Sequence, residues 1–209
     1  MEDGFYPDRA ESAPLDAALH ALATGGFVVI SDTPDVGATM IMDAAQVSDA
    51  AINFMATHGR GLIGVAVTPG RAARMGLTLQ PRRNHDRAGP AYTYSVEARV
   101  GVSTGISAAD RALTIRVLAD PRAQGGDLVT PGHIFPQIAL GSETDEAPSC
   151  AELAVALLRA AGCPPVAVTC SLLTASGAAA TPRDARALAE AHDLPCIGTA
   201  DLAALPRSI

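Results

Sequence analysis

The chain has 209 residues, enough for one domain or two small ones, and its 48% apolar and 18% charged residues can form a core and exclude disorder of the whole chain. The formal net charge of −7 disfavours a nucleic-acid binder, which needs a basic face, and no apolar run reaches the ~18 residues of a membrane-spanning helix. All 15 basic residues are arginines, so catalysis by a lysine is excluded.

We expect a cytoplasmic protein, because the N-terminus lacks the basic, apolar and small-residue pattern of a secretory signal. The four cysteines form no CxxC pair, so a thiolate zinc site is not indicated.

Helices and strands alternate in the N-terminal half. Residues 1–14 are polar with two prolines and predict a flexible arm, and we expect a single domain over 15–209. Leucine spacing predicts a helix over 15–23, and a strand over 27–30 then leads into a polar loop at 31–40. The elements expected next are a helix over 49–57 with Ser48 as N-cap, a strand over 61–67, a short helix begun by Thr68 and Pro69, and a polar loop over 80–90.

Three patterns typical of helix starts occur in the C-terminal half, each with Ser or Thr followed three residues later by an acidic residue. They are Ser107 to Asp110, Ser149 to Glu152 and Thr181 to Asp184, and they predict helices that end near residues 118, 161 and 192. Strands are expected over 91–98, 133–139, 165–173 and 195–198, with a last helical turn at 201–205. This interleaving predicts an α/β (α+β) fold, in which helices pack on a mixed sheet.

Four segments resemble the 3,4-dihydroxy-2-butanone 4-phosphate synthase family, the lyases that supply the four-carbon unit of riboflavin. They are GGFVVISD with VSDAAINFMATHGRGLIGVAVTPGRAARMGL (25–32 and 47–77), NHDRAGPAYTYSVEA (84–98), GVSTGISAADRALTI (101–115) and TPGHIFPQ (130–137). The resemblance covers nearly the whole chain from residue 15. It implies the fold of that family and a homodimer, because family members place their sites near a two-fold interface.

The chain departs from the family pattern at the positions that bind substrate and metal. Family members carry an acidic D-D-E-D-R-E-N-E-G-D loop after the first strand, which falls on 31–40 when no gap is allowed, and a G-H-T-E segment that falls on 149–152. At these family positions the chain has Asp35 for a substrate-binding Arg, Val36 for a magnesium-binding Glu, Met40 for the final Asp, Cys150 for a magnesium-binding His and Ser171 for a further Glu.

We therefore expect a protein with no cofactor, although the family implies magnesium. Magnesium prefers oxygen ligands, but Val36 offers none and Cys150 offers only a soft sulfur. Without the metal, no evident group replaces its polarisation of a substrate ketone.

Four residues are candidates for catalysis. His133 keeps the family position and is either a general acid–base or a structural residue at a strand end. Cys150 lies where a helix dipole lowers the pKa of a thiol, so it is either a nucleophile or a packing residue. Asp32 and Asp35 are either an acid–base pair or two solvated side chains.

The candidates for substrate binding come from four segments. Arginines in the polar loop can hold a carboxylate or phosphate, and a helix start can hold an anion, but solvation and helix capping explain the same residues. The less polar 31–40 loop favours a ligand that is less charged than a sugar phosphate. The candidates are Arg82, Arg83, His85, Asp86, Thr104, Ser107, Val36, Met40, Glu152 and Ser171.

Three functions are compatible with these residues. The first is an enzyme of lyase, isomerase or cyclase type in specialised metabolism, which acts without a metal on a different, less charged small molecule. The second is a non-catalytic dimeric binding or structural protein on the same fold. The third is retained 3,4-dihydroxy-2-butanone 4-phosphate synthase activity on ribulose 5-phosphate, with Asp32, Asp35 and Glu152 compensating for the lost ligands.

Overall fold

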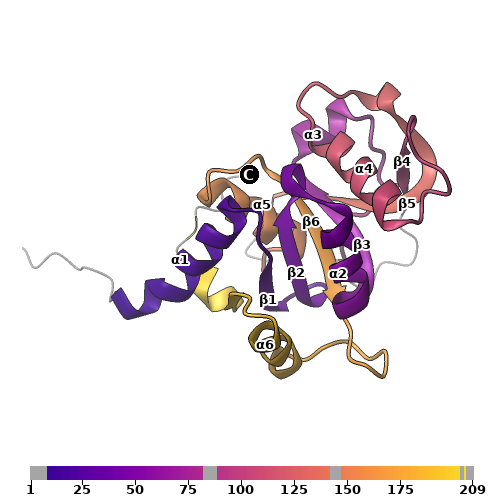
Figure 1. The fold of residues 1–209 in the computed structure, drawn as a ribbon. Coiled ribbons are helices and arrows are strands. Elements are labelled where there is room, and N and C mark those ends of the chain that lie inside the picture. Colours follow the sequence, from indigo (N-terminus) through magenta and orange to yellow (C-terminus); the bar gives the residue numbers. More distant parts are fainter. Residues whose placement is uncertain (1–8, 82–88, 142–146, 203–204, 206–209) are drawn as a thin grey trace, which may run out of the picture.

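A seven-stranded mixed sheet lies at the centre of the computed structural model, which describes residues 9–81, 89–141, 147–202 and 205 (Figure 1). The strand order is β4-β5-β3-β6-β2-β1-β7. The β1–β7 and β3–β5 pairs are parallel, and the other neighbouring strands are antiparallel. The expected mixed sheet with packed helices is confirmed.

The helices and strands have the following bounds. The strands are β1 (Val28–Thr33), β2 (Gly37–Asp43), β3 (Arg60–Val67), β4 (Val96–Ala98), β5 (Leu128–Ile138), β6 (Val166–Leu172) and β7 (Cys196–Ile197). The α-helices are α1 (Arg9–Ala23), α2 (Asp49–Phe54), α3 (Pro69–Arg74), α4 (Ala108–Ala119), α5 (Cys150–Ala160) and α6 (Pro182–Ala191). The shorter helical turns are η1 (Ala44–Gln46), η2 (Met55–Gly59), η3 (Gly125–Asp127) and η4 (Thr199–Leu202).

Helices cover both faces of the sheet, so its central strands are apolar on both sides. On one face, Val65 and Val168 pack in a cluster that includes side chains of α2, α4 and α6. On the other face, Ala66 and Ala167 pack against α1 and α5. Within the described part of the chain, we find no helix that combines the length and apolar character needed to cross a membrane.

The first helix begins at Arg9, six residues before the expected start at Leu15. The expectation of a flexible arm through residue 14 is therefore wrong for residues 9–14, whereas residues 1–8 lie outside the described ranges. Pro14 lies inside this helix and lacks the N–H that would bond to the carbonyl of residue 10. Burial of Ala18 and Leu22 against α5 holds the helix in spite of that missing bond.

The polar stretch 31–40, expected to be a loop, is a hairpin. Strand β1 continues to Thr33, three residues form the turn, and β2 begins at Gly37. Ser31, Thr33 and Thr39 are buried although they are polar, so composition alone misled the prediction. Met40, a candidate for substrate binding, is fully buried in the core.

The strand expected over 91–98 is shorter than its alternation suggested. Only Val96–Ala98 form β4, while Tyr92 and Thr93 make isolated bridges to Gln137 and Leu79. Ser107 caps α4 as expected, because its hydroxyl accepts a hydrogen bond from the N–H of Asp110.

The other two helix starts contain complete capping boxes, in which Ser149 pairs with Glu152 and Thr181 pairs with Asp184. The box expected at the start of α4 does not close, because the Asp110 carboxylate bonds to a preceding loop instead.

Arg71 joins α3 to the end of α4. Its guanidinium donates hydrogen bonds to the carbonyls of Leu118 at 2.8 Å, Val117 at 3.2 Å and Asp120 at 2.5 Å. These carbonyls lie at the helix C-terminus, where backbone acceptors lack partners within the helix. Burial lowers the pKa of Arg71.

We expect Arg71→Met to lower the free energy of unfolding by about 2 kcal/mol, because a shape-filling side chain without donors leaves several carbonyls unpaired. Urea denaturation followed by circular dichroism measures this change. Arg74→Ala is the matched control in the same helix, because Arg74 is exposed, and its effect should stay within about 0.5 kcal/mol. Equal effects of the two substitutions would contradict this role of Arg71.

Candidate functional site

The turn between β1 and β2 brings the Asp35 carboxylate to the first residue of α5. Its Oδ1 accepts a hydrogen bond of 2.8 Å from the backbone N–H of Cys150. Its Oδ2 is buried and has no hydrogen-bond partner. Burial raises the pKa of Asp35, and the backbone hydrogen bonds from Cys150 and Val36 act in the opposite direction. The turn therefore presents one bound and one unpaired carboxylate oxygen.

The Cys150 thiol lies beneath this carboxylate and is fully buried. Burial and the nearby Asp35 charge raise the pKa of the thiol to about 12, while hydrogen bonds with Thr39 and Thr33 act to lower it. We expected the helix dipole to lower this pKa. That expectation is wrong, because the cost of burying a thiolate exceeds the effect of the dipole.

Three other expected site residues lie in or close to this turn. Glu152 is in the first turn of α5, where its Oε2 accepts a 2.6 Å hydrogen bond from the N–H of Ser149. Ser171 lies opposite Thr39 in the β2–β6 pairing, so their side chains share one face of the sheet. Val36 is half-buried in the turn.

Asp32 faces a different element. Its carboxylate accepts hydrogen bonds from the N–H and hydroxyl of Thr199, at 2.8 and 3.2 Å. Asp35 bonds instead to α5, so the expected acid–base pair of the two aspartates is not formed.

Tyr92 and Gln137 add polar groups that were not among the expected site residues. They pair across an isolated bridge, and Gln137 Oε1 is buried without a partner. Burial raises the pKa of the Tyr92 phenol, a hydrogen bond with the Gln137 side chain acts to lower it, and the nearby Asp35 carboxylate acts to raise it. No spacing in the sequence relates these residues to Asp35, so only the fold could reveal them.

A second cluster surrounds His133 on β5. Its Nδ1 forms a hydrogen bond with the Glu97 carboxylate of β4. The His133 side chain is 44% exposed, whereas that of Glu97 is 15% exposed. Glu97 was missed in the sequence because it lies 36 residues away and matches no motif with His133.

The loop before α4 packs beside this pair. Asp110 is buried and accepts hydrogen bonds from the N–H groups of Ser103 and Gly105, at 3.1 and 3.0 Å. Burial raises the pKa of Asp110, but hydrogen bonds from Ser103, Ser107 and Gly105 outweigh it and hold this pKa below its usual value. Thr104 and Ser107 are exposed on the same loop.

Within the described ranges, no hydrogen bond or ion pair joins the Asp35 cluster to the His133 cluster. The chain thus carries two groups of expected site residues. Arg82, Arg83, His85 and Asp86 lie outside the described residues.

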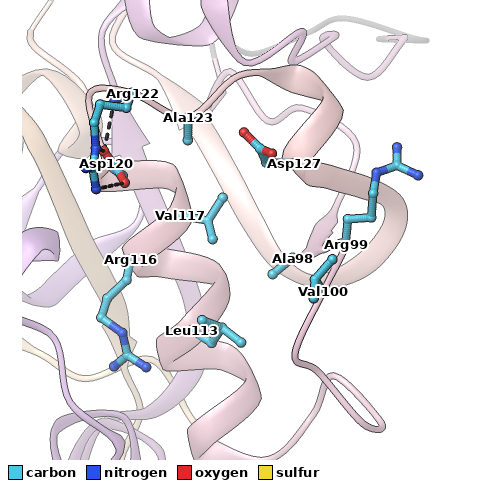
Figure 2. Close-up of a pocket in the computed structure, with 10 residues that line it drawn as sticks. All are labelled: Ala98, Arg99, Val100, Leu113, Arg116, Val117, Asp120, Arg122, Ala123 and Asp127. Carbon is cyan, nitrogen blue, oxygen red and sulfur yellow. Dashed lines mark hydrogen bonds and ion pairs between the residues drawn. The ribbon is translucent and has the colours of Figure 1, made fainter.

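A cavity of about 580 Å³ lies beside α4, and none of its lining residues belongs to either cluster (Figure 2). Apolar side chains such as Leu113 and Val117 line it together with three arginines. Arg122 pairs with Asp120 at 3.0 Å, as the dashed lines in Figure 2 show, and Arg99 donates to backbone carbonyls.

The third arginine, Arg116, donates to the carbonyl of Val47 at 3.2 Å. All three guanidinium groups that line the cavity thus have partners within the protein.

Comparison with known proteins gives a consistent match. The family model for 3,4-dihydroxy-2-butanone 4-phosphate synthase matches residues 16–205. A protein of that name from Chromobacterium violaceum is 38% identical over 194 residues, covering 92% of each chain. The riboflavin biosynthesis protein RibBA of Aquifex aeolicus is 37% identical and matches 90% of this chain with 47% of its own length.

One of the solved structures that this chain resembles contains magnesium. A crystal structure of 3,4-dihydroxy-2-butanone 4-phosphate synthase in complex with two magnesium ions has a TM-score of 0.83 and 33% identity, covering 90% of this chain and 94% of that one. This relative overturns our expectation of a protein without a cofactor. That expectation rested on Val36 and Cys150 at the two ligand positions, with the family loop placed without a gap.

We expect at most two of the four cysteines to react with Ellman's reagent in the native protein at pH 8. Cys150 and Cys170 are buried, and burial raises the pKa of their thiols to about 12 and about 11. Cys163 and Cys196 are partly exposed. Thionitrobenzoate release measures the count, which should rise to four in guanidinium chloride.

Cys150→Ser is the matched variant and should leave the native count unchanged. A lower count for this variant would mean that Cys150 is an accessible thiolate, contrary to the geometry.

Proposed function

The chain belongs to the 3,4-dihydroxy-2-butanone 4-phosphate synthase family, and from this premise we propose that it converts ribulose 5-phosphate into 3,4-dihydroxy-2-butanone 4-phosphate and formate. The observation that carries the proposal is the Asp35 carboxylate at the start of α5. The resemblance assigns the two magnesium ligands to a loop Glu and to the residue at position 150, so these two positions must be close in space.

Asp35, rather than Val36, is the loop residue whose side chain reaches position 150. We propose that this hairpin turn is one residue shorter than that of the family, which would place Asp35 at the position of the loop ligand. An acidic side chain is thereby retained at the position of the loop ligand, which supports retention of the family's chemistry.

Magnesium is the cofactor that this proposal includes. The ion is commonly held by one or two carboxylates, with substrate and water oxygens completing its shell. The buried, unpaired Oδ2 of Asp35 fits that requirement, while Cys150 provides no oxygen. Within the described ranges no three His, Cys, Asp or Glu side chains gather into a metal cluster, so the remaining ligands would come from substrate and solvent.

The bound ion supplies polarisation of a substrate ketone, and the protein's own residues handle the protons. His133 is the proposed general acid–base, because an imidazole exchanges protons near neutral pH. Glu152 keeps its carboxylate at the start of α5, where it orients Ser149. Thr104 and Ser107 lie on the exposed loop beside the His133 cluster and are proposed to contact substrate.

A homodimer is part of the same proposal. Among the described residues of one chain, no hydrogen bond joins the Asp35 and His133 clusters, and the family resemblance implies sites near a two-fold interface. A second copy could therefore complete each site with the other cluster.

A second candidate function is turnover of a less charged small molecule. The half-buried Val36 in the turn favours it, because an apolar side chain occupies a loop that carries acidic and basic groups in the family. The two candidates differ in whether the phosphate of the substrate is required.

We expect the protein to release formate from ribulose 5-phosphate in the presence of magnesium, as measured by a coupled formate dehydrogenase assay. Asp35→Asn should slow release by about 10²-fold or more and weaken magnesium binding in calorimetry, because it removes a charged oxygen donor. Asp32→Asn is the matched control and should retain activity, because Asp32 bonds to Thr199.

Release from ribulose but not from ribulose 5-phosphate would favour the second candidate. Turnover of neither compound would contradict both and favour a non-catalytic dimeric binding protein.

A further inference from the structure

The imidazole of His133 has two nitrogens, and a neutral ring carries a proton on only one of them. The nitrogen with the free electron pair is the one that can accept a proton from a substrate. A general base therefore needs a fixed tautomer, which a hydrogen bond to the other nitrogen can provide.

The Glu97 carboxylate provides that hydrogen bond. An ionised carboxylate only accepts hydrogen bonds, so Nδ1 of His133 must carry the proton that joins the two side chains. We propose that Glu97 is a positioning residue, which holds the Nδ1–H tautomer of His133 and leaves Nε2 as the proton acceptor. The inference deepens the proposed function, on which its catalytic part rests.

Two glycines confine the Glu97 side chain from opposite segments. A Cβ atom on Gly105 would overlap the Glu97 carboxylate, and a Cβ on Gly132 would overlap the backbone of Val96 and contact Cγ of Glu97. The carboxylate thus fills space that is available only because both neighbours lack side chains.

Hydrogen bonds fix both glycines in place. The N–H of Gly105 donates to the buried Asp110 carboxylate at 3.0 Å, and the N–H of Gly132 donates to the Ser95 hydroxyl at 3.2 Å. Gly105 also has a φ of +80°, which a residue with a Cβ rarely adopts. The start of α4 therefore holds the loop that limits where Glu97 can lie.

A solvated ion pair that only stabilises the fold would not require two glycines to confine its carboxylate. The Glu97 side chain is mostly buried while the His133 ring is nearly half exposed. The carboxylate thus anchors one edge of the ring from within the protein and leaves the rest of the ring accessible. This arrangement is the one expected of a carboxylate that orients a catalytic histidine.

The test measures the tautomer directly. ¹⁵N NMR of protein labelled at histidine distinguishes a protonated Nδ1 from a protonated Nε2, and His133→Asn assigns the signals. We expect the Nδ1–H form in the unmodified protein. Glu97→Met removes the acceptor but keeps the length of the side chain, and it should shift His133 towards Nε2–H. Glu97→Asp keeps a carboxylate and should retain more of the Nδ1–H form.

Gly105→Ala is a second variant that leaves every ionisable group in place. It should displace the carboxylate and shift the tautomer as Glu97→Met does. Gly177→Ala is its matched control, because Gly177 has a similar φ of +84° but nothing within 4 Å of the added methyl group. The melting temperatures of these two variants measure how much each is destabilised by the backbone strain that both substitutions cause.

In the formate assay, Glu97→Met and Gly105→Ala should lower kcat by about 10²-fold with little change in KM. An unchanged tautomer in Glu97→Met, or equal tautomers in the Gly105→Ala and Gly177→Ala variants, would overturn the inference. The NMR readout does not require turnover, so a protein that releases no formate would contradict the proposed function without affecting the test of the tautomer.

Discussion

The Asp35 carboxylate is largely removed from water, and the backbone N–H groups around it must compensate its charge. Hydrogen bonds from Cys150 and from the hairpin turn do so on one side of the carboxylate. They tie the β1–β2 hairpin to α5 and place the Cys150 thiol beneath the turn. Because an unpaired buried polar atom costs about 1–3 kcal/mol, the unpaired Oδ2 is an unfavourable feature of the turn.

A buried carboxylate that accepts backbone hydrogen bonds also supports the second cluster. Asp110 is buried at the start of α4 and accepts hydrogen bonds from the loop that contains Ser103 and Gly105. That loop confines Glu97, and Glu97 holds His133. The start of α4 therefore positions the Glu97 side chain through the backbone of this loop. Backbone groups have fewer conformations than long side chains, so they limit the positions of Glu97 more closely.

Arg71, which joins two helices, and the arginines that line the cavity bond to groups of the protein itself. Arg71 satisfies carbonyls at the end of α4, and Arg99 donates to the carbonyl of Leu128. A planar guanidinium with five donors suits this role, which a lysine could fill only in part.

The sequence by itself determined the mixed sheet, the helix starts capped by Ser48, Ser107 and Ser149, and the family. These features depend on local spacing and on motifs that are contiguous in the chain. Glu152 was also found in this way, because its capping partner lies three residues before it.

Only the tertiary structure decided which residues meet at the sites. Asp35 and Cys150 are 115 residues apart, and Glu97 and His133 are 36 apart, so no local pattern links either pair. The length of a hairpin turn is set by strand pairing across the sheet, so the sequence alone did not show that Asp35 is the turn residue that meets Cys150. Burial likewise decided the state of the Cys150 thiol, since desolvation depends on everything packed around it rather than on its position at a helix start.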